Sequence, residues 1–378
     1  MSKKEVEKKL KDNKEFVIRL KVPKDKKVIC DDLLRGNIEF DSNGLDDQVL
    51  IKSDGFPTYH FAVVVDDYLM KISHVIRSVE WLPSFPKHVL IYEALAIKKP
   101  VFVHTPSILN KDSKGKLSKR HGHSSVDSYK MEGFLPEAII NFLALLGWSH
   151  PDGKDIFTYK EFVEKFDIKD IKTSLPRFDI EKLTWMNGEY IRGLQDKEFV
   201  ERLDEWKNFI DSINYNIPDA STNISGAKLS NLKVDIEVFD RNFWSQLNQD
   251  NKLLFASINK ERIKKFSDIL DLNRFFYDFS RKVPKDKLYK FKNEEEVRRH
   301  LKWFNSELEK IDSWTLESLK KLEIIVKNRA GFLGWRVIEV FHPIRVAITK
   351  SDISPPLFES IYIFGRKNVI SNLNKVLN

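Results

Sequence analysis

The segment HFAVVVDDYLMKISHVIRSVEWLPSFPKHVLIYEALAIKKPVFVHTPSIL (60–109) contains three apolar runs whose order indicates the fold class. The first, HFAVVVDDY (60–68), is continuously apolar and ends in aspartates, which is typical of a strand buried on both faces. KHVLIYEALAI (87–97) has apolar residues at helical spacing, and Pro86 suits the first turn of a helix. VFVHTPSIL (101–109) again has the pattern of a strand. Strand, helix and strand in this order predict an α/β region.

The chain on the N-terminal side of this region is mixed. FVIRLKVP (16–23) alternates apolar and polar positions as a strand does, and Pro23 ends it. Two further strands are expected at VICDDL (28–33) and NIEF (37–40). Lys3–Lys14 is expected to form a short solvated helix.

Helices dominate the pattern from residue 134 onward. Three segments have helical spacing or cap residues: LPEAIINFLALLG (135–147), FTYKEFVEKF (157–166) and IEKLTWMNGEYIRGL (180–194). Gly147 is expected to cap the first, and Thr158 with Glu161 has capping-box spacing in the second. NIPDASTNISGA (216–227) is rich in turn formers and predicts a linker, whereas 228–378 is helical in pattern. The predicted fold class is therefore α/β plus all-α.

Composition limits the classes of protein that are open. The chain has 378 residues, 42% of them hydrophobic, which is enough for two or three folded domains. A single cysteine, Cys30, excludes a disulfide framework and a cysteine-based zinc site. The sequence has no apolar run of about 18 residues and no signal peptide, so a soluble, cytoplasmic protein is expected. The net charge of +8 weakly favours a polyanionic partner.

A glycine-bounded basic loop, GKLSKRHGHSS (115–125), follows the last predicted strand. Ligands of α/β sheets bind beyond the carboxyl ends of the strands, so this loop is well placed. Lys116, Lys119 and Arg120 are able to clamp a polyphosphate, and such charges help most where negative charge develops during a reaction. From charge alone, a solvated surface loop is the plainer interpretation.

Long collinear segments of the chain resemble the glutamyl-tRNA synthetases, which are class I aminoacyl-tRNA synthetases, in their bacterial and organellar form. The resemblance runs from about residue 16 to the end and includes 34–55, 54–95, KLSKRHG (116–122), EGFLPEAIINFLALLGWS (132–149), FDIEKLTWMNGEYI (178–191) and 342–373. It implies a partial Rossmann-like catalytic domain followed by helical stem-contact and helical anticodon-binding domains. The implied reaction joins glutamate to tRNA(Glu) with ATP as the energy source.

By this resemblance KLSKR is the second class I signature, a loop that holds the phosphates of ATP. Lys116 and Lys119 would stabilise the transition state of adenylate formation, Arg120 would assist, and Ser118 would shape the loop. Leu117 and Trp81 are also expected at the ATP site. ATP is expected to enter as its Mg²⁺ complex, and no protein-bound zinc is expected.

The resemblance also implies a pocket for glutamate. Arg77 would bind the side-chain carboxylate, because a bidentate guanidinium suits a carboxylate and disfavours a neutral amide. Tyr59 would line the pocket, and Glu80 and Trp81 would lie beside it. The plainer alternatives are a half-buried sheet residue for Tyr59, a surface ion pair for Arg77 and core packing for Trp81. Asp66 and Asp67 are interpreted equally well as residues that cap the predicted strand.

The sequence departs from the family pattern in one major respect. The first class I signature, H-x-G-H, is absent from these residues, and Met1 falls at the end of the insertion that divides the family's catalytic fold. We therefore expect a half-sheet with an uncovered edge and an apolar face without its partner. A fragment, a split gene with a separate N-terminal half chain, and an inactive tRNA-binding remnant all remain open. Val63 stands where relatives often have asparagine, and Ser78-Val79 replaces a commoner small-acidic pair.

The expected division is the end of the connective, acceptor-binding insertion (1–50), the second half of the catalytic domain (51–133), the stem-contact domain and linker (134–227), and the helical anticodon-binding domain (228–378). Cations and aromatic residues mix along 287–304 and 364–370, where they could meet phosphates and unpaired bases. The expected partners are tRNA(Glu), L-glutamate and ATP, with tRNA(Gln) left open and no membrane.

Two related families fit less well. Glutaminyl-tRNA synthetases usually end in β-barrels, whereas the C-terminal part of this chain is helical in pattern. The short tRNA-modifying relative has no anticodon domain. No metal site is expected from the histidines, because they lack paired spacing with a carboxylate: His60, His74, His88, His121 and His123.

Overall fold

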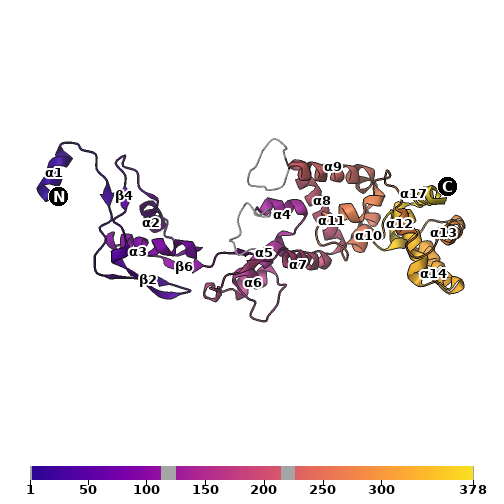
Figure 1. Cartoon of the computed structure of the whole chain (residues 1–378), viewed down its shortest axis with the longest axis horizontal. Helices are drawn as coiled ribbons and strands as arrows, with labels where there is room; N and C mark the ends of the chain where they lie inside the picture. Colours follow the sequence, from indigo (N-terminus) through magenta and orange to yellow (C-terminus); the bar gives the residue numbers. More distant parts are fainter. Residues whose placement is uncertain (1, 112–124, 214–225, 378) are drawn as a thin grey trace. The chain divides into compact units, whose positions relative to one another are not determined.

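The structure, a computed structural model, describes residues 2–111, 125–213 and 226–377. This part of the chain forms two compact units (Figure 1). Unit 1 contains residues 2–111 and 143–179, and unit 2 contains residues 125–142 and 180–377. Each unit is described by itself below. The basic loop and most of the predicted linker lie outside the described residues.

Unit 1 is built on a four-stranded sheet with the strand order β3-β2-β6-β5. The strands are β2 (Lys27–Asp32), β3 (Gly36–Asp41), β5 (His74–Ser78) and β6 (Val101–Thr105). β2 and β3 pair antiparallel, whereas β5 runs parallel to β6 with Arg77 opposite His104. β2 meets β6 in parallel at Asp32 and Phe102. Because side chains alternate between faces, Asp32, Arg77 and His104 share one face of the sheet.

Two helices build the core of unit 1 against this sheet: α2 (Tyr59–Leu69) and α3 (Phe85–Ala94). Cys30, Phe85 and Phe102 are among the buried residues that join the strands to α3. Pro86 lies in the first turn of α3, as predicted, where its missing N–H costs no helical hydrogen bond. The helix predicted at 87–97 is present as α3, which ends at Ala94. Of the strand predicted at 101–109, residues 101–105 form β6, and Leu109 belongs to the separate strand β7 (Leu109–Asn110).

The prediction of a buried strand at 60–68 is wrong, because these residues form most of α2. A short continuous apolar run does not distinguish a strand from a buried helix by its period. Thr58 begins the helix, and its hydroxyl donates to the carbonyl oxygen of Val49 at 2.7 Å, which ties α2 to the preceding strand. Asp66 and Asp67 therefore lie in the last turns of a helix and cap no strand.

Two small sheets complete the β structure of unit 1. β1 (Ile18–Arg19) pairs with β4 (Val49–Ile51), and β7 (Leu109–Asn110) pairs with β8 (Arg177–Phe178). The strands predicted at 28–33 and 37–40 are confirmed as β2 and β3, whereas the strand predicted at 16–23 is reduced to β1. The predicted N-terminal helix is present as α1 (Lys3–Lys11).

The predicted helix ends near residues 147 and 158 are partly confirmed. α5 (Pro136–Gly147) includes Gly147 as its last residue instead of ending before it. α6 (Tyr159–Lys165) begins as predicted, because the Thr158 side chain accepts a hydrogen bond from the Glu161 backbone N–H. The Glu161 carboxylate contacts His150 and Lys154.

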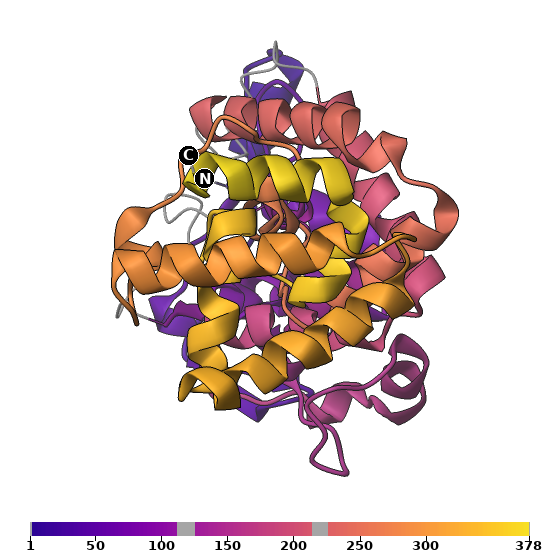
Figure 2. The ribbon, with the colours of Figure 1, turned by 90° about the vertical axis from the view of Figure 1, so that its right-hand side faces the viewer.

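Unit 2 consists of helices with a large shared core. Its main helices are α4 (Val126–Glu132), α7 (Ile180–Gly193), α8 (Asp196–Ser212), α9 (Gly226–Asn242), α10 (Gln249–Asn259), α11 (Asp268–Leu272), α12 (Lys285–Leu288), α13 (Glu294–Glu309), α14 (Leu316–Leu333), α15 (Val337–Thr349), α16 (Leu357–Phe364) and α17 (Arg366–Leu377). Near the C-terminus α13 packs on α17, and α14 packs on α15 and α16 (Figure 2). Gly226 starts α9, so the last two residues of the predicted linker are helical. No described helix is long and apolar enough to cross a bilayer.

The face of the sheet opposite α3 carries exposed apolar side chains. Ile29 is 53% exposed, Ile76 57% and Val101 41%. Among the described strands β5 is the outermost on its side of the sheet. Val103 of β6 is completely buried on this same face, so the face is open to water only in part. The uncovered edge expected from the sequence is present among the described strands, and the uncovered face is present in part.

Candidate glutamate and nucleotide site

Arg77 lies near the carboxyl end of β5 and makes two hydrogen bonds to histidines. Its Nε donates to Nε2 of His104 over 2.9 Å, and its Nη1 contacts Nδ1 of His88 over 2.9 Å. His104 is the register partner of Arg77 on β6, and His88 lies on α3. The guanidinium carbon also lies 5.4 Å from the ring centre of Phe102. The sheet register and the position of α3 thus hold Arg77 from two sides.

The third nitrogen of the guanidinium, Nη2, is buried and has no hydrogen-bond acceptor among the described residues. No described carboxylate forms an ion pair with Arg77, and burial lowers the pKa of its guanidinium. A buried cation without a paired anion is costly, so this nitrogen is suited to a carboxylate that arrives from outside. The surface ion pair offered as the plainer interpretation of Arg77 is not found among the described residues.

Two aromatic residues expected at the site lie beside Arg77. The rings of Tyr59 and Trp81 have centres 5.3 Å apart, and the guanidinium of Arg77 lies 5.9 Å from the Trp81 ring. Tyr59 is 55% exposed and Trp81 36% exposed, so neither is a core residue. Glu80 lies on the 3-10 helix η2 (Val79–Ser84), where its N–H donates to the Ser78 hydroxyl at 3.4 Å. The structure therefore brings Tyr59, Arg77 and Trp81 together.

A group of polar residues behind Arg77 was not predicted from the sequence. Asp32 is completely buried, and its Oδ2 lies 2.7 Å from Nδ1 of His104. His60 Nδ1 lies 2.8 Å from His88 Nε2. The sequence singles out His60 and His88 only as candidate metal ligands, and His104 not at all, although a buried histidine needs some partner for each ring nitrogen. The buried hydroxyl of Tyr92 also has no partner among the described residues.

Val63, the departure from the family pattern, lies on α2 one turn after Tyr59 and packs against the core of unit 1. A valine offers no hydrogen bond, so the polar groups around Arg77 come from other elements. The residues of the basic loop, Lys116, Leu117, Ser118, Lys119 and Arg120, lie outside the described residues, as do His121 and His123.

One cluster has donor atoms at metal-binding distances. Ligand atoms of His150, Asp152 and Glu161 lie within 4.8 Å of one another. However, His150 Nδ1 accepts the Asp152 backbone N–H at 3.1 Å, so the neutral ring carries its proton on Nε2, which faces Glu161. Lys154 and Lys165 already neutralise the two carboxylates. This arrangement suits a structural polar cluster better than a metal centre.

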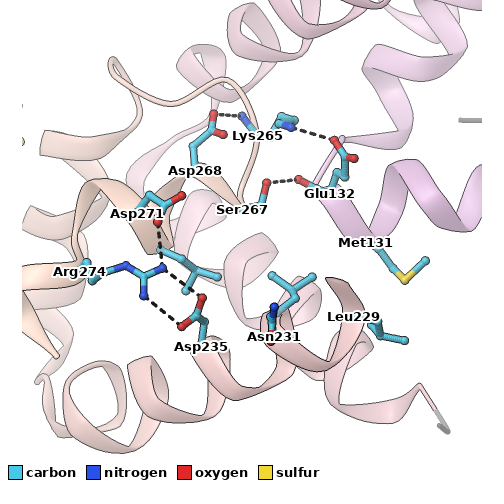
Figure 3. A pocket seen from close by; sticks show the side chains of 12 residues that line it. Met131, Glu132, Leu229, Asn231, Asp235, Lys265, Ser267, Asp268, Asp271 and Arg274 are labelled. Carbon is cyan, nitrogen blue, oxygen red and sulfur yellow. Dashed lines mark hydrogen bonds and ion pairs between the residues drawn. The ribbon is translucent and has the colours of Figure 1, made fainter. Parts of the chain in front are cut away.

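A cavity of about 360 Å³ lies in unit 2, between α4, α9 and α11 (Figure 3). Its charged side chains pair with one another. Arg274 contacts Asp235 at 3.1 Å and Asp271 at 2.9 Å, and Lys265 contacts Glu132 at 2.8 Å. Because these cations and anions are mutually satisfied, the cavity presents no charge comparable to that of Arg77.

Several cations of the mixed basic and aromatic segments are engaged within unit 2. Arg298 donates to the carbonyl oxygen of Val376 at 3.0 Å, and Lys287 pairs with Asp352 at 2.7 Å. These contacts fasten α13 to α17 and α12 to the segment between α15 and α16. Such residues are therefore partly structural, and charge alone does not identify a nucleic-acid contact.

Comparisons with known proteins agree with this geometry. Residues 1–185 match the family described as tRNA synthetases class I (E and Q), catalytic domain, and residues 198–377 match the anticodon binding domain family. Glutamate–tRNA ligase 2 of Caldicellulosiruptor saccharolyticus is 33% identical over 371 residues, covering 98% of this chain and 70% of the relative. The glutamate–tRNA ligase of Gloeobacter violaceus is 35% identical, covering 98% of this chain and 69% of the relative.

A solved structure is similar along the whole chain. The glutamate tRNA ligase of Elizabethkingia meningosepticum, crystallised in complex with its amino acid, superposes with a TM-score of 0.80 at 28% identity. The match covers 100% of this chain and 71% of that structure. The α/β unit followed by a helical anticodon domain therefore has the fold expected from the sequence. On these similarities the chain belongs to the glutamate–tRNA ligase family of class I tRNA synthetases.

Proposed function

We propose that this chain takes part in the ATP-dependent activation of glutamate and its transfer to tRNA(Glu). In the first step an oxygen of the glutamate α-carboxylate bonds to the α-phosphorus of ATP, and pyrophosphate leaves. In the second step the tRNA terminal hydroxyl attacks the acyl carbon, and AMP leaves. The observation that carries this proposal is the buried Nη2 of Arg77, which lies near Tyr59 and Trp81 and has no hydrogen-bond partner in the part of the chain that the structure describes.

The side-chain carboxylate of glutamate is the anion that we assign to Arg77. A guanidinium held at two nitrogens offers its remaining N–H groups in a fixed plane, which favours a carboxylate over a neutral amide. Tyr59, Glu80 and Trp81 would surround the substrate. Lys116, Leu117, Ser118, Lys119 and Arg120 would hold the phosphates of ATP with its Mg²⁺, Lys116 and Lys119 stabilising the charge that develops at the α-phosphate and Arg120 assisting.

The fourfold division predicted from the sequence is retained as part of this proposal. Residues 1–50 would end the acceptor-binding insertion, 51–133 would complete the catalytic domain, 134–227 would contact the tRNA stem, and 228–378 would bind the anticodon. The matches to a catalytic family at 1–185 and an anticodon binding family at 198–377 support the order of these parts.

We further propose that adenylate formation requires an H-x-G-H segment, which these 378 residues do not contain. The segment could be supplied by the same polypeptide or by a separate chain. The exposed apolar residues Ile29, Ile76 and Val101 support this view, because a covering segment would remove them from water. A catalytically inactive tRNA-binding remnant is the alternative, and it predicts tRNA binding without glutamate binding.

Three measurements on the 378-residue polypeptide distinguish these proposals. They are glutamate-dependent ATP–pyrophosphate exchange with tRNA present, L-glutamate binding by calorimetry, and tRNA(Glu) binding by filter retention. We expect tRNA and glutamate binding, with glutamate binding lost in Arg77→Ala, and no exchange. Exchange that Lys119→Ala lowers by about 10²–10³-fold would support the phosphate clamp and refute the need for H-x-G-H. Binding of tRNA alone would favour the remnant.

A further inference from the structure

The hydrogen bonds around Arg77 have only one consistent direction. Arginine carries donors and no acceptor, so Nε2 of His104 and Nδ1 of His88 must both accept from it. Each neutral imidazole then keeps its proton on the other nitrogen. His104 therefore donates from Nδ1, and His88 donates from Nε2.

Both of those protons have a partner in the structure. His104 Nδ1 donates to Oδ2 of Asp32 at 2.7 Å, and the same oxygen accepts the His104 backbone N–H at 2.9 Å. His88 Nε2 donates to Nδ1 of His60 at 2.8 Å. Arg77 is thus bound to two neutral rings, each of which is held by a further side chain.

We propose that His104 and His88 are positioning residues, which aim Arg77 at the substrate carboxylate without placing a negative charge in contact with its guanidinium. The proposal rests on the assignment of Arg77 to the glutamate side chain. A carboxylate in place of either histidine would hold the guanidinium equally well, but it would also neutralise it and compete with the substrate. An imidazole lone pair fixes the geometry without supplying a negative charge.

The carboxylate of Asp32 lies on the far side of the His104 ring from Arg77, so one imidazole separates it from the guanidinium. Its Oδ1 accepts the backbone N–H groups of Leu34 and Arg35 at 3.1 Å, so the carboxylate is fixed by backbone donors as well as by His104. The result is a chain of hydrogen bonds in the order Asp32, His104, Arg77, His88 and His60, of which Arg77 and His60 are half-buried and the others are buried. Because only a charged ligand group completes this chain, it favours glutamate over glutamine.

Burial favours the neutral forms of the two rings that accept from Arg77, and the positive charge of Arg77 acts in the same direction, whereas Asp32 raises the pKa of His104. Burial and the positive charge of Arg77 lower the pKa of His88 to about 3, and burial lowers the pKa of His104. The pKa of His60 is lowered by burial, then by Lys87 and Arg77, against an opposing effect of Asp46. Arg35 also faces His104 and lowers its pKa. A protonated His88 or His104 could no longer accept from Arg77.

Two substitutions of His88 separate its contact with Arg77 from its bulk. Asparagine places an amide oxygen near the position of Nδ1, so His88→Asn retains an acceptor for Arg77. Glutamine places its amide near Nε2, so His88→Gln retains a contact with His60 and loses the one with Arg77. We expect His88→Gln to weaken L-glutamate binding by about 10- to 100-fold, the scale found for outer partners of a ligand-binding group, and His88→Asn to restore most of it.

His104→Asn provides an independent variant, because it retains a donor to Asp32 and removes the acceptor for Arg77 Nε. It should weaken glutamate binding by a similar factor and lower the ratio of glutamate to glutamine affinity. His74→Asn is the matched control on β5, the strand of Arg77, since His74 is exposed, and it should bind as the unaltered chain does. Equal glutamate affinity in His88→Gln, His88→Asn and the unaltered chain would overturn the proposal.

A second measurement tests the proposal without any ligand. In ¹⁵N-histidine-labelled protein, long-range ¹H–¹⁵N spectra should show His104 with its proton on Nδ1 and His88 with its proton on Nε2, both neutral at pH 6. The opposite tautomer, or titration of either ring near pH 6.5, would refute the arrangement. If Arg77→Ala binds glutamate as the unaltered chain does, the assignment of Arg77 to the glutamate carboxylate is refuted. If Arg77→Ala loses glutamate binding and the histidine variants retain it, only the positioning role is refuted.

Discussion

Replacing Asp32 by asparagine tests the chain of hydrogen bonds at its anionic end. Asn keeps the size of the side chain but converts one acceptor oxygen into a donor. In the structure both carboxylate oxygens face two N–H donors each: Oδ1 faces the N–H groups of Leu34 and Arg35, and Oδ2 faces the backbone N–H and Nδ1–H of His104. In either orientation of the amide, its NH₂ group meets two donors.

The size of the effect follows from these contacts. Asp32 and His104 have completely buried side chains, so the lost hydrogen bonds are not replaced by water. Hydrogen bonds to a charged group contribute about 1.5–3 kcal/mol each. Removing one partner from a buried set of charges, here the anion that compensates Arg77, costs about 3–5 kcal/mol. We therefore expect Asp32→Asn to lower the local stability of the sheet by about 3–5 kcal/mol.

Hydrogen exchange measured by mass spectrometry is the suitable assay, because it reports on the sheet separately from the helical unit. Since each 1.4 kcal/mol is about tenfold, amides of β2 and β6 should exchange about two to four orders of magnitude faster. Asp31→Asn is the matched control, because the neighbouring Asp31 is exposed on the other face of β2. Equal exchange rates in the two variants would refute the reasoning.

Three further outcomes are expected. Gly133→Ala should lower the free energy of unfolding of unit 2 by about 2–5 kcal/mol in denaturant unfolding, since φ is +83° and the new Cβ would lie 2.7 Å from the backbone N of Phe266. Gly334→Ala is the control: its φ is +66° but no atom lies within 4 Å of the new Cβ, so it should cost only about 1–2 kcal/mol. His88 has a pKa of about 3 in the folded chain against 6.5 unfolded, so its contribution to stability should be complete above pH 6.5 and be lost as the pH falls toward 3; a thermal midpoint independent of pH between 7.5 and 4.5 would contradict this. Arg77→Lys should weaken L-glutamate binding at least about tenfold in calorimetry, because an ammonium ion cannot donate in the plane of a bidentate fork; unchanged affinity would mean that only its charge matters.

Much of the fold could be predicted from the sequence because the signals are local. Pro86 before an amphipathic run, Thr158 before α6, and alternating residues in β2 each depend on neighbours within a few positions. The prediction of a strand at 60–68 is wrong because it also depends only on local signals. Its valines favour a strand locally, and only the packing of Val64 against α3 and the sheet decides for a helix.

The residues behind Arg77 have no comparable signal. His88 and His104 are single histidines among apolar neighbours, a pattern that fits an ordinary buried residue. Asp32 is the last residue of β2, a position where the sequence pattern fits a turn residue. Their contacts with Arg77 and with one another join positions that are between 11 and 72 residues apart, so no regular spacing along the chain predicts them.

The sequence by itself determined the family and, through it, the expectation that Arg77 binds a carboxylate. Those conclusions rest on the identity and order of residues, which are present before folding. Only the tertiary structure decided how that charge is held. The β5–β6 register sets His104 opposite Arg77, and the position of α3 brings His88 to its other side. Hydrogen bonds between side chains need atoms within about 3 Å, and that distance is set by packing instead of by sequence separation.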